Sequence, residues 1–269
     1  MMLINKSIQI IDLGLWLPKS RTLVIADLHI GLEDALNKQG VLIPKFHFKD
    51  LTDRLEKIIN YIQVELKQKI KLIVVNGDIK HEFGTISDEE WRNTLKVIDY
   101  LSLKSEKLIL IKGNHDTILG PIAEKRKIDV VDYYVSEVES ILVVHGDKPI
   151  KQKIKKIESN SIKVDSKFVK IKTVIMGHEH TAVLIGDETR KETYKCFLVG
   201  KYKLSNLRKI NLIAMPSMNQ LSQGTDVTKE SLLSPLLNGK EVNLRNFDVY
   251  VVADNSENVY GFGKLKKLI

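Results

Sequence analysis

The segment "LIVVNGDIKH" (72–81) carries a short run of β-prone apolar residues directly into Asn-Gly-Asp, with Lys80 and His81 just beyond. Such an apolar run is typical of a buried strand. Asn-Gly-Asp is typical of a turn, and an isolated Asp in this position is most often only a turn former. Taken alone, the segment predicts a strand that ends in a turn around Asp78.

The same arrangement recurs in four other parts of the chain. Aliphatic runs end in polar clusters at "TLVIADLH" (22–29), "LILIKGNHD" (108–116), "ILVVHGD" (141–147) and "TVIMGHEH" (173–180). Continuous apolar runs of this length favour strands that are buried on both faces. Functional groups of α/β sheets gather at the carboxyl ends of the strands, so we expect the polar clusters to lie at those ends.

Helical patterns lie between some of these strands. From Phe48 to Leu66, apolar residues recur with the period of an amphipathic helix. Ser87 opens the capping-box pattern "SDEE", and apolar residues at helical spacing follow from Trp91 to Leu101. Strands that alternate with helices predict an α/β layered fold.

The sequence pattern changes after His180. The stretches "AVLIGD", "KCFLVGKYK", "INLIAMPS" and "FDVYVVADN" are typical of strands joined by short turns, and they predict a second, mainly antiparallel sheet that packs on the first. No linker rich in Pro, Gly or Ser separates the two parts. We therefore expect residues 1–269 to form a single α/β domain, a two-sheet layered sandwich flanked by helices. Its polar clusters would lie in 27–180 and the rest of its second sheet in 181–269.

The composition is that of an ordinary soluble globular protein. The chain has 269 residues, of which 43% are apolar and 28% charged. Lys and Arg (42) outnumber Asp and Glu (34), and the net charge is +8. This excess favours polyanionic partners such as nucleic acid, and it also aids solubility.

The composition also indicates in which cellular compartment the protein works. The single cysteine, Cys196, excludes an intrachain disulfide and a cysteine-based zinc cluster, and it fits a reducing setting. No apolar run approaches the roughly 20 residues of a membrane-spanning helix, and the N-terminus lacks a clear signal-peptide core. We expect a cytoplasmic protein with no membrane contact, and the oligomeric state stays open.

Metal-ligating residue types concentrate in the five clusters. They form a set of nitrogen and oxygen donors without sulfur: Asp27, His29, Asp78, Asn114, His145, His178 and His180. Such groups would repel one another or lose hydration if they converged, unless a cation neutralised them. Seven donors suit two ions of five or six coordinates, and imidazole with carboxylate favours Mn, Fe, Zn or a similar metal over Ca or Mg. Asp78 is the expected bridge, because a carboxylate offers two oxygens.

The order of the blocks "DLH", "GD", "GNHD", "HGD" and "GHEH" resembles that of the calcineurin-like metallophosphoesterases. The resemblance implies one metal site of Asp27, His29, Asp78 and His180, and a second of Asp78, Asn114, His145 and His178. It also implies that His115 protonates the leaving group or steadies the transition state, with Asp116 accepting its second N–H. The nucleophile would be a metal-bound water.

A narrower resemblance extends over nearly the whole chain. "GDIKHEFG" (77–84) lacks the Arg-rich extension of phosphoprotein phosphatases, and His81 resembles the His that lies beside the substrate phosphate in SbcD-type repair nucleases. With "GLEDALNKQGVLIP" (31–44), "SDEEW" (87–91) and "PSMNQLSQGT" (216–225), the chain looks closest to archaeal SbcD-related phosphoesterases and bacterial DNA-ligase-associated metallophosphoesterases.

This narrower resemblance implies a phosphodiesterase or nuclease in DNA repair, with DNA-repair proteins as possible partners. Two divalent ions would serve it, Mn²⁺ first, with Fe, Zn, Ni or Co as alternatives. No long coiled-coil site or capping domain is evident after residue 180, which puts processive double-strand exonuclease action in doubt.

Several alternatives stay open. A phosphomonoesterase or a nucleotide pyrophosphatase would use the same metal centre. A non-catalytic nucleic-acid-binding protein is a further alternative, but such a protein would be expected to lack some of the ligands, and here none is missing. His81, Asn114 and Lys80 are candidate substrate contacts, although a solvated turn explains Lys80 as well. Nine lysines in 148–172 form either a solvated helix face or a phosphate-tracking patch near the site. Residues 216–225 either approach the site from the second sheet or form an ordinary turn.

Overall fold

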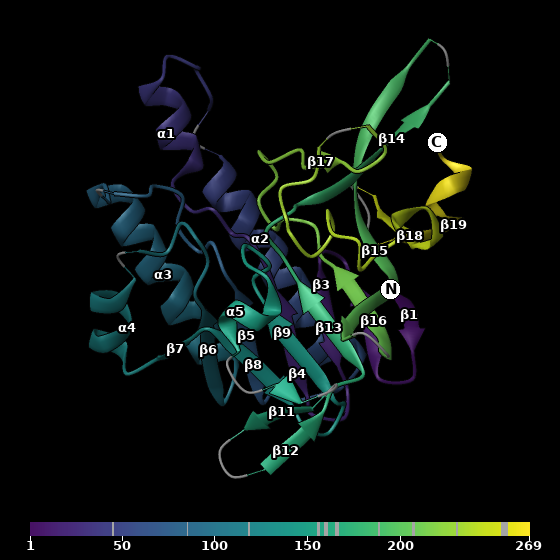
Figure 1. The fold of residues 1–269 in the computed structure, drawn as a ribbon. Coiled ribbons are helices and arrows are strands. Elements are labelled where there is room, and N and C mark those ends of the chain that lie inside the picture. The colour runs from purple at the N-terminus through teal and green to yellow at the C-terminus, as the bar shows by residue number, and fades with distance from the viewer. Residues whose placement is uncertain are drawn as a thin grey trace.

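The computed structural model describes residues 1–44, 46–84, 86–117, 119–154, 157–158, 161–164, 167–187, 189–205, 208–229, 231–253 and 258–269. Two large β-sheets pack face to face, and helices cover the outer face of the first sheet (Figure 1). The predicted fold class, an α/β two-sheet sandwich with flanking helices, is therefore confirmed.

The first sheet holds seven strands in sequence order. They are β1 (Met2–Asn5), β2 (Ile8–Ile11), β3 (Gly14–Leu17), β4 (Thr22–Ile25), β5 (Leu72–Asn76), β6 (Lys107–Ile111) and β7 (Asp129–Val131). Strands β1 to β4 form an antiparallel meander, whereas β4 to β7 run parallel and are joined by helical connections.

Two of the helices follow the predicted patterns, and the others were not predicted. They are α1 (Leu32–Lys38), α2 (His47–Asn60), α3 (Asp88–Lys104), α4 (Gly120–Arg126) and α5 (Ile150–Lys153), with a π-helix, η1 (Tyr61–Glu65), and 3₁₀ turns η2 (Leu244–Asn246) and η3 (Leu265–Lys267). Ser87 caps α3, because its hydroxyl accepts a hydrogen bond from the Glu90 amide at 3.1 Å. Within the described residues, no helix is long and apolar enough to cross a membrane.

The second sheet begins earlier in the chain than the sequence predicts. It contains β8 (Tyr133–Ser136), β9 (Ile141–Val144), β13 (Thr173–Met176), β14 (Thr181–Gly186), β15 (Lys191–Ser205), β16 (Arg208–Ala214), β17 (Thr225–Asp226), β18 (Asp248–Val252) and β19 (Val259–Lys264). Two of the five runs with polar ends, β9 and β13, thus belong to this sheet and not to the first. The sheet is mixed, since β9, β13 and β16 run parallel.

Alternation along the inner strands divides the apolar side chains between two cores. In β9, Ile141 and Val143 face the core between the sheets, whereas Leu142 and Val144 face a second core on the outer side of the second sheet. The first core also takes in the apolar faces of α2 and α3, on the other side of the first sheet. Burial on both faces explains why these strands read as continuous apolar runs.

Among the described residues of the lysine-rich segment 148–172, only those of α5 are helical. After α5 the segment forms a small antiparallel sheet of β10 (Ile157–Glu158), β11 (Ser161–Val164) and β12 (Lys167–Lys170), in which Ile162 and Val169 are buried and Lys167 is exposed. Lys155 and Lys156 lie outside the described residues. The backbone N–H of Lys172 donates to the Ser140 carbonyl, and β13 begins at the next residue. The small sheet therefore lies near the amino end of β13, whereas the polar cluster follows its carboxyl end.

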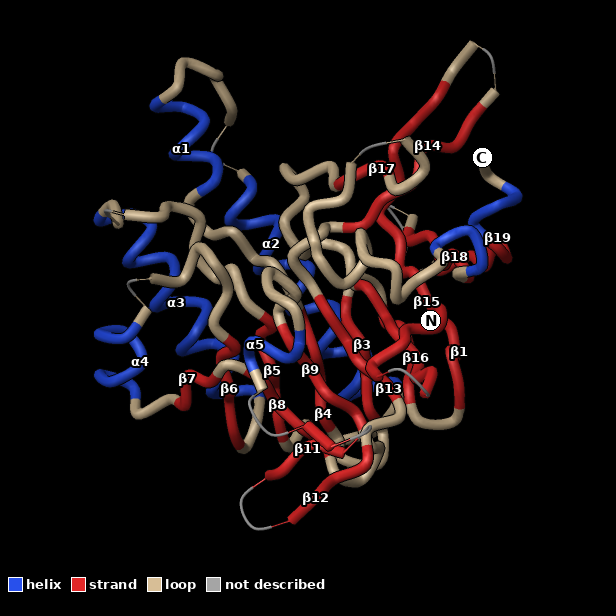
Figure 2. Tube along the Cα trace, viewed as in Figure 1, coloured by secondary structure: helices blue, strands red, loops and turns tan. Residues whose placement is uncertain are grey.

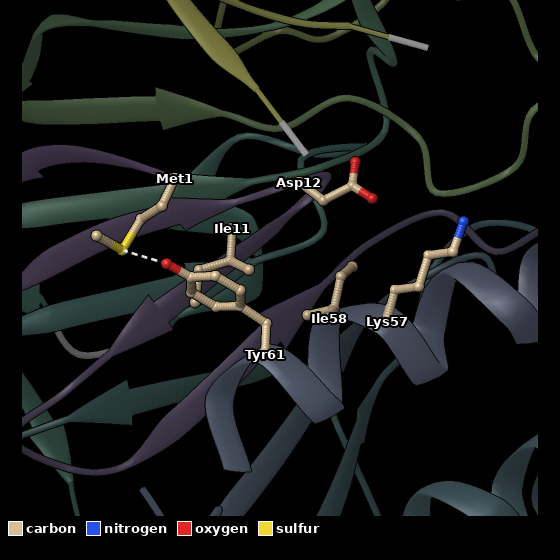
Figure 3. Close-up of a pocket in the computed structure, with 6 residues that line it drawn as sticks. All are labelled: Met1, Ile11, Asp12, Lys57, Ile58 and Tyr61. Atoms are coloured by element: carbon tan, nitrogen blue, oxygen red, sulfur yellow. Dashed lines mark hydrogen bonds between the residues drawn. The ribbon is translucent and has the colours of Figure 1, made fainter. Parts of the chain in front are cut away.

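A buried ion pair connects α2 to the turn between β2 and β3. The Arg54 guanidinium donates to the Asp12 carboxylate at 2.6–2.9 Å, and both side chains are buried. Asp12 also borders a cavity of about 10 Å³, lined by Met1, Ile11, Asp12, Lys57, Ile58 and Tyr61, where the Tyr61 hydroxyl points at the Met1 sulfur (Figure 3). A cavity of that size holds at most one water, so it is no ligand site.

Arg54→Leu should lower the free energy of unfolding by about 3–5 kcal/mol, because the Asp12 carboxylate would stay buried without its partner. The double variant Asp12→Asn/Arg54→Leu should recover part of this loss. Denaturant unfolding followed by circular dichroism measures both. As a control, Lys69→Ala removes an exposed ion pair with Glu106 and should change stability little. Equal effects of Arg54→Leu and Lys69→Ala would contradict the importance of the buried pair.

Candidate metal centre

The polar clusters of both sheets meet at one edge of the sandwich. Strands β4, β5 and β6 run parallel in the first sheet, and β9 and β13 in the second, so their carboxyl ends lie at corresponding edges. Asn76, the last residue of β5, bridges the sheets: its side-chain amide donates to the Val144 carbonyl at 3.0 Å. Figure 2 shows loops gathered beyond these strand ends, in the middle of the molecule.

Most of the predicted ligands adopt left-handed backbone. The φ angles of Asp27, His29, Asp78, His178 and His180 are 56°, 42°, 48°, 66° and 52°. A non-glycine residue in this conformation costs roughly 1–2 kcal/mol. The loops are held by backbone hydrogen bonds, including Asp27 N–H to the Gly77 carbonyl at 3.2 Å and His29 N–H to the Asp78 carbonyl at 2.9 Å. The turns aim each side chain back across the strand ends.

Two glycines leave room for this convergence. A Cβ on Gly77, whose φ is +79°, would lie 2.1 Å from Nδ1 of His145. A Cβ on Gly113 would lie 2.1 Å from Oδ1 of Asp78. Any side chain at either position would displace a ligand, which explains glycine in both "GD" and "GNHD".

The donors form two clusters that share Asp78. One consists of Asp27, His29, Asp78 and His180, and the other of Asp78, His145 and His178; in each, the candidate ligand atoms lie within 4.8 Å of one another. Oδ2 of Asp78 lies 3.2 Å from Nε2 of His145 and 3.7 Å from Nε2 of His29. Oδ1 of Asn114 joins the second cluster, 3.1 Å from Nε2 of His145.

These clusters bring together the residues of the two donor sets that the resemblance implies, with Asp78 in both and Asn114 beside the second. Nε2 of His29 and Nε2 of His180 face each other at 3.0 Å, so two imidazoles direct their lone-pair positions at one point. Convergent imidazoles and carboxylates are the donors that divalent transition metals prefer. The arrangement is consistent with a dinuclear metal site.

Burial and mutual charge perturb the donors. Burial lowers the pKa of His29, and the nearby His180 lowers it further. Burial, with the charge of His145, also lowers the pKa of His178 to about 4. Burial disfavours the charged form of His145 as well, but its hydrogen bond to Asp78 and the charges of Asp78 and Asp27 outweigh this and raise its pKa to about 9.

The loop at 216–225 holds the candidate ligands in place by hydrogen bonds to their backbone and side chains. The Ser217 hydroxyl donates to the Asp27 carbonyl at 2.7 Å, and the Asn219 amide donates to the Leu28 and His29 carbonyls at 3.0 and 3.1 Å. The Ser222 hydroxyl lies 2.9 Å from Nδ1 of His180, which leaves Nε2 of that ring for the cluster. The loop therefore does approach the site from the second sheet.

A buried lysine organises this loop, and sequence reasoning missed it. Nζ of Lys195, on β15, donates to the carbonyls of Ser217, Asn219 and Ser222 at 2.9, 2.8 and 2.6 Å. The residue lies in "KCFLVGKYK", where nothing distinguishes it from a surface lysine. A buried ammonium needs such partners, because an unpaired charge in the interior is costly.

His81 and His115 stand beside the first cluster. Nδ1 of His81 lies 3.4 Å from Nδ1 of His29, and His29, His81 and His115 form a third group of converging donors. Burial and the neighbouring His115 lower the pKa of His81. Nδ1 of His115 contacts the His81 carbonyl, and since a carbonyl only accepts, Nδ1 carries the proton and Nε2 stays free.

Two predicted residues have other roles in the structure. Asp116 is buried, and its carboxylate accepts hydrogen bonds from the backbone N–H groups of Gly113 and Ile79, both at 3.0 Å; the partner of His115 is the His81 carbonyl instead. Lys80 is also fully buried, with its ammonium directed to the Glu82 carbonyl, so it is neither a solvated turn lysine nor presented to a substrate.

Glu90 is a further residue that the sequence did not single out for the site. Its pattern predicts a capping box, but Oε1 of Glu90 instead accepts from the backbone N–H groups of His81 and Glu82, at 2.8 and 3.0 Å. The side chain is 1% exposed. The first turn of α3 thus anchors the loop that carries His81.

An α/β sandwich with two His/Asp clusters that share a carboxylate is consistent with a dinuclear metal site. The sequence model of the calcineurin-like phosphoesterase family matches residues 20–182, more than half of the chain. The chain therefore belongs to this family. No curated protein matches its sequence significantly.

The chain is similar to solved structures, of which one shares its fold. Nuclease MPE from Pseudomonas putida is 17% identical, with 97% of this chain and 98% of that chain covered and a TM-score of 0.59. Vacuolar protein sorting 29 from Cryptosporidium parvum is 13% identical, with 90% and 97% covered and a TM-score of 0.37. At these identities, the first match shows a common fold only.

Metal affinity should rise with pH between about 6 and 8. In the metal-free protein, His145 keeps its proton up to a pH of about 9, and a cation must displace that proton to bind. Calorimetric titration with Mn²⁺ in buffers of different ionisation enthalpy should show proton release that falls as the pH approaches 9. Uptake without proton release at pH 7 would contradict the protonated state of His145.

Proposed function

We propose that the chain is a dinuclear-metal phosphodiesterase that hydrolyses phosphodiester bonds in nucleic acid or nucleotides. The observation that carries this proposal is the pair of partly exposed imidazoles, His81 and His115, beside the Asp27–His29–Asp78–His180 cluster. They supply proton-transfer and phosphate-binding groups in addition to the metal donors.

The metal would be held by residues of both sheets. Asp27, His29, Asp78 and His180 would form one site, and Asp78, Asn114, His145 and His178 the other, with Mn²⁺ as the first expectation and Fe, Zn, Ni or Co as alternatives. Such ions, when bound, neutralise charge on the phosphoryl group and provide a nucleophile at neutral pH. Because both sheets supply donors, we also propose that residues 1–269 work as a single domain.

The chain's own residues would handle the proton and the substrate. With Nδ1 of His115 held by the His81 carbonyl, the imidazolium form of the ring would carry its second proton on Nε2 and would pass that proton to the leaving oxygen. His81, with its lowered pKa, would be largely neutral at pH 7 and would donate a hydrogen bond to a phosphate oxygen. The Asn114 amide offers N–H groups to the same phosphate while its oxygen faces His145.

Nucleic acid is the substrate class that we favour. The net charge of +8 suits a polyanion, and a nuclease stands among proteins of the same fold. A role in DNA repair, membership of the DNA-ligase-associated group and a cytoplasmic location are parts of the same proposal. Metal-stripped protein reloaded with Mn²⁺ should cleave bis-p-nitrophenyl phosphate and single-stranded DNA or RNA.

Failure to cleave any of these diesters would overturn the proposal. Faster hydrolysis of p-nitrophenyl phosphate than of the diesters would favour a phosphomonoesterase, and cleavage of nucleoside polyphosphates alone would favour a pyrophosphatase. DNA binding with a steep salt dependence but without hydrolysis would indicate a non-catalytic protein.

His115→Ala should lower turnover about 10²- to 10⁴-fold, because it removes the proposed proton donor, and should leave the metal content near normal. His145→Ala is the contrasting variant and should lose metal, since it removes a donor of the second cluster. Steady-state kinetics together with metal analysis of the purified variants distinguish the two effects. Metal loss in His115→Ala would refute its assignment as a non-ligand.

A further inference from the structure

We propose that Phe83 is a stacking platform for the base of the nucleoside that carries the leaving oxygen, an inference that rests on the proposed phosphodiesterase function. The Phe83 side chain is 56% exposed, although a phenyl ring is normally stabilised by burial. Its ring centroid lies 3.7 Å from that of His115, with 34° between the planes. The exposed ring is therefore in contact with the proposed proton donor.

Phe83 continues a row of rings that starts at the metal cluster. The ring of His29 lies edge-on to that of His115, with centroids 4.9 Å apart, and His81 stacks on His115 at 5.3 Å. Phe83 lies beyond His115 and is the most exposed of the four. The rings form a wall that leads from a metal ligand to the protein surface.

The backbone around Phe83 is held in place. The Thr117 hydroxyl donates to the Phe83 carbonyl at 2.5 Å, which connects the loop after β5 to the loop after β6. The two residues before Phe83 are fixed by the buried carboxylate of Glu90, which accepts both His81 and Glu82 N–H groups. The ring is thus presented from a supported segment, which lowers the entropic cost of binding to it.

The position of the ring points to its occupant. If His115 protonates the leaving oxygen, the nucleoside on that oxygen lies on the His115 side of the site, where Phe83 offers a π-face. Bases of any sequence stack on aromatic side chains, and loss of one such stack weakens binding by about five- to a hundredfold. Bases in a duplex are already stacked on each other, so the platform would favour single strands or frayed ends.

Phe83→Ala tests the platform, with Phe83→Trp as the restoring variant. Phe168→Ala is the matched control, because it removes a phenyl ring of similar exposure, 49%, from β12 in the small separate sheet. The first measurement uses Mn²⁺-loaded protein and a single-stranded oligonucleotide that contains 2-aminopurine. Stopped-flow fluorescence before cleavage reports stacking of that base, and it needs no hydrolysis.

Wild-type protein, Phe83→Trp and Phe168→Ala should quench the 2-aminopurine fluorescence, and Phe83→Ala should not. The second measurement compares KM for cleavage of a normal strand and of one with an abasic residue on the leaving side. Phe83→Ala should raise KM about tenfold for the normal strand and leave it unchanged for the abasic strand.

Equal quenching by wild-type protein and Phe83→Ala would overturn the platform, as would an equal rise in KM for both strands. Either result would leave the phosphodiesterase function standing, because cleavage itself would still be observed. If wild-type protein cleaved no diester at all, the proposed function would fail, and the quenching measurement would still decide whether Phe83 stacks a base.

Discussion

The arrangement of the loops depends on two carboxylates that are buried where the two sheets meet. Asp27 is 0% and Asp78 2% exposed, and an isolated buried charge would be very costly. The protein surrounds them with donors: the His178 amide bonds to Asp27 at 3.0–3.1 Å, and the His115 amide bonds to Asp78 at 2.9 Å. The left-handed turns and the small glycines are the local means by which these partners reach the carboxylates.

A second tier of buried carboxylates fixes the loops themselves. Asp116 and Glu90 accept backbone N–H groups from the loop after β5, and Glu179 accepts those of Leu233 and Ser234 at 3.2 and 2.7 Å. The buried ammonium of Lys195 also fixes a loop, because it donates hydrogen bonds to three carbonyls of the 216–225 loop. The loops after β5, β6 and β13 and the 216–225 loop are thus tied to other parts of the chain by charge-assisted hydrogen bonds, which are stronger than neutral ones.

The sequence predicts the strands and singles out the side chains that converge at their ends, because both signals are local: an apolar run followed by His, Asp or Asn. It does not predict the roles of Asp116, Glu90 or Lys195, since these depend on which loops meet in space. Of the two alternatives for 148–172, the solvated helix face fails beyond α5, because the strands there are too short for their alternation to stand out among the lysines. The sequence also places the start of the second sheet too late in the chain. A strand that is buried on both faces is a continuous apolar run whichever sheet it belongs to, so the pattern does not assign β9 and β13 to a sheet.

The bridge between Asn76 and the β9 strand has a consequence for how the chain folds. Asn76 and His145 are separated by 69 positions, and Asp27 and His178 by 151, so the donors cannot converge until most of the chain is ordered. Contacts of such long range are late and slow to form, because loop-closure entropy is lost before they stabilise anything. A cation that binds only the docked sheets favours the native state by mass action. A bound cation would thus stabilise the packing of the two sheets against each other. Removal of the cation would weaken the contacts between the sheets before it disturbed the strand pairing within either sheet.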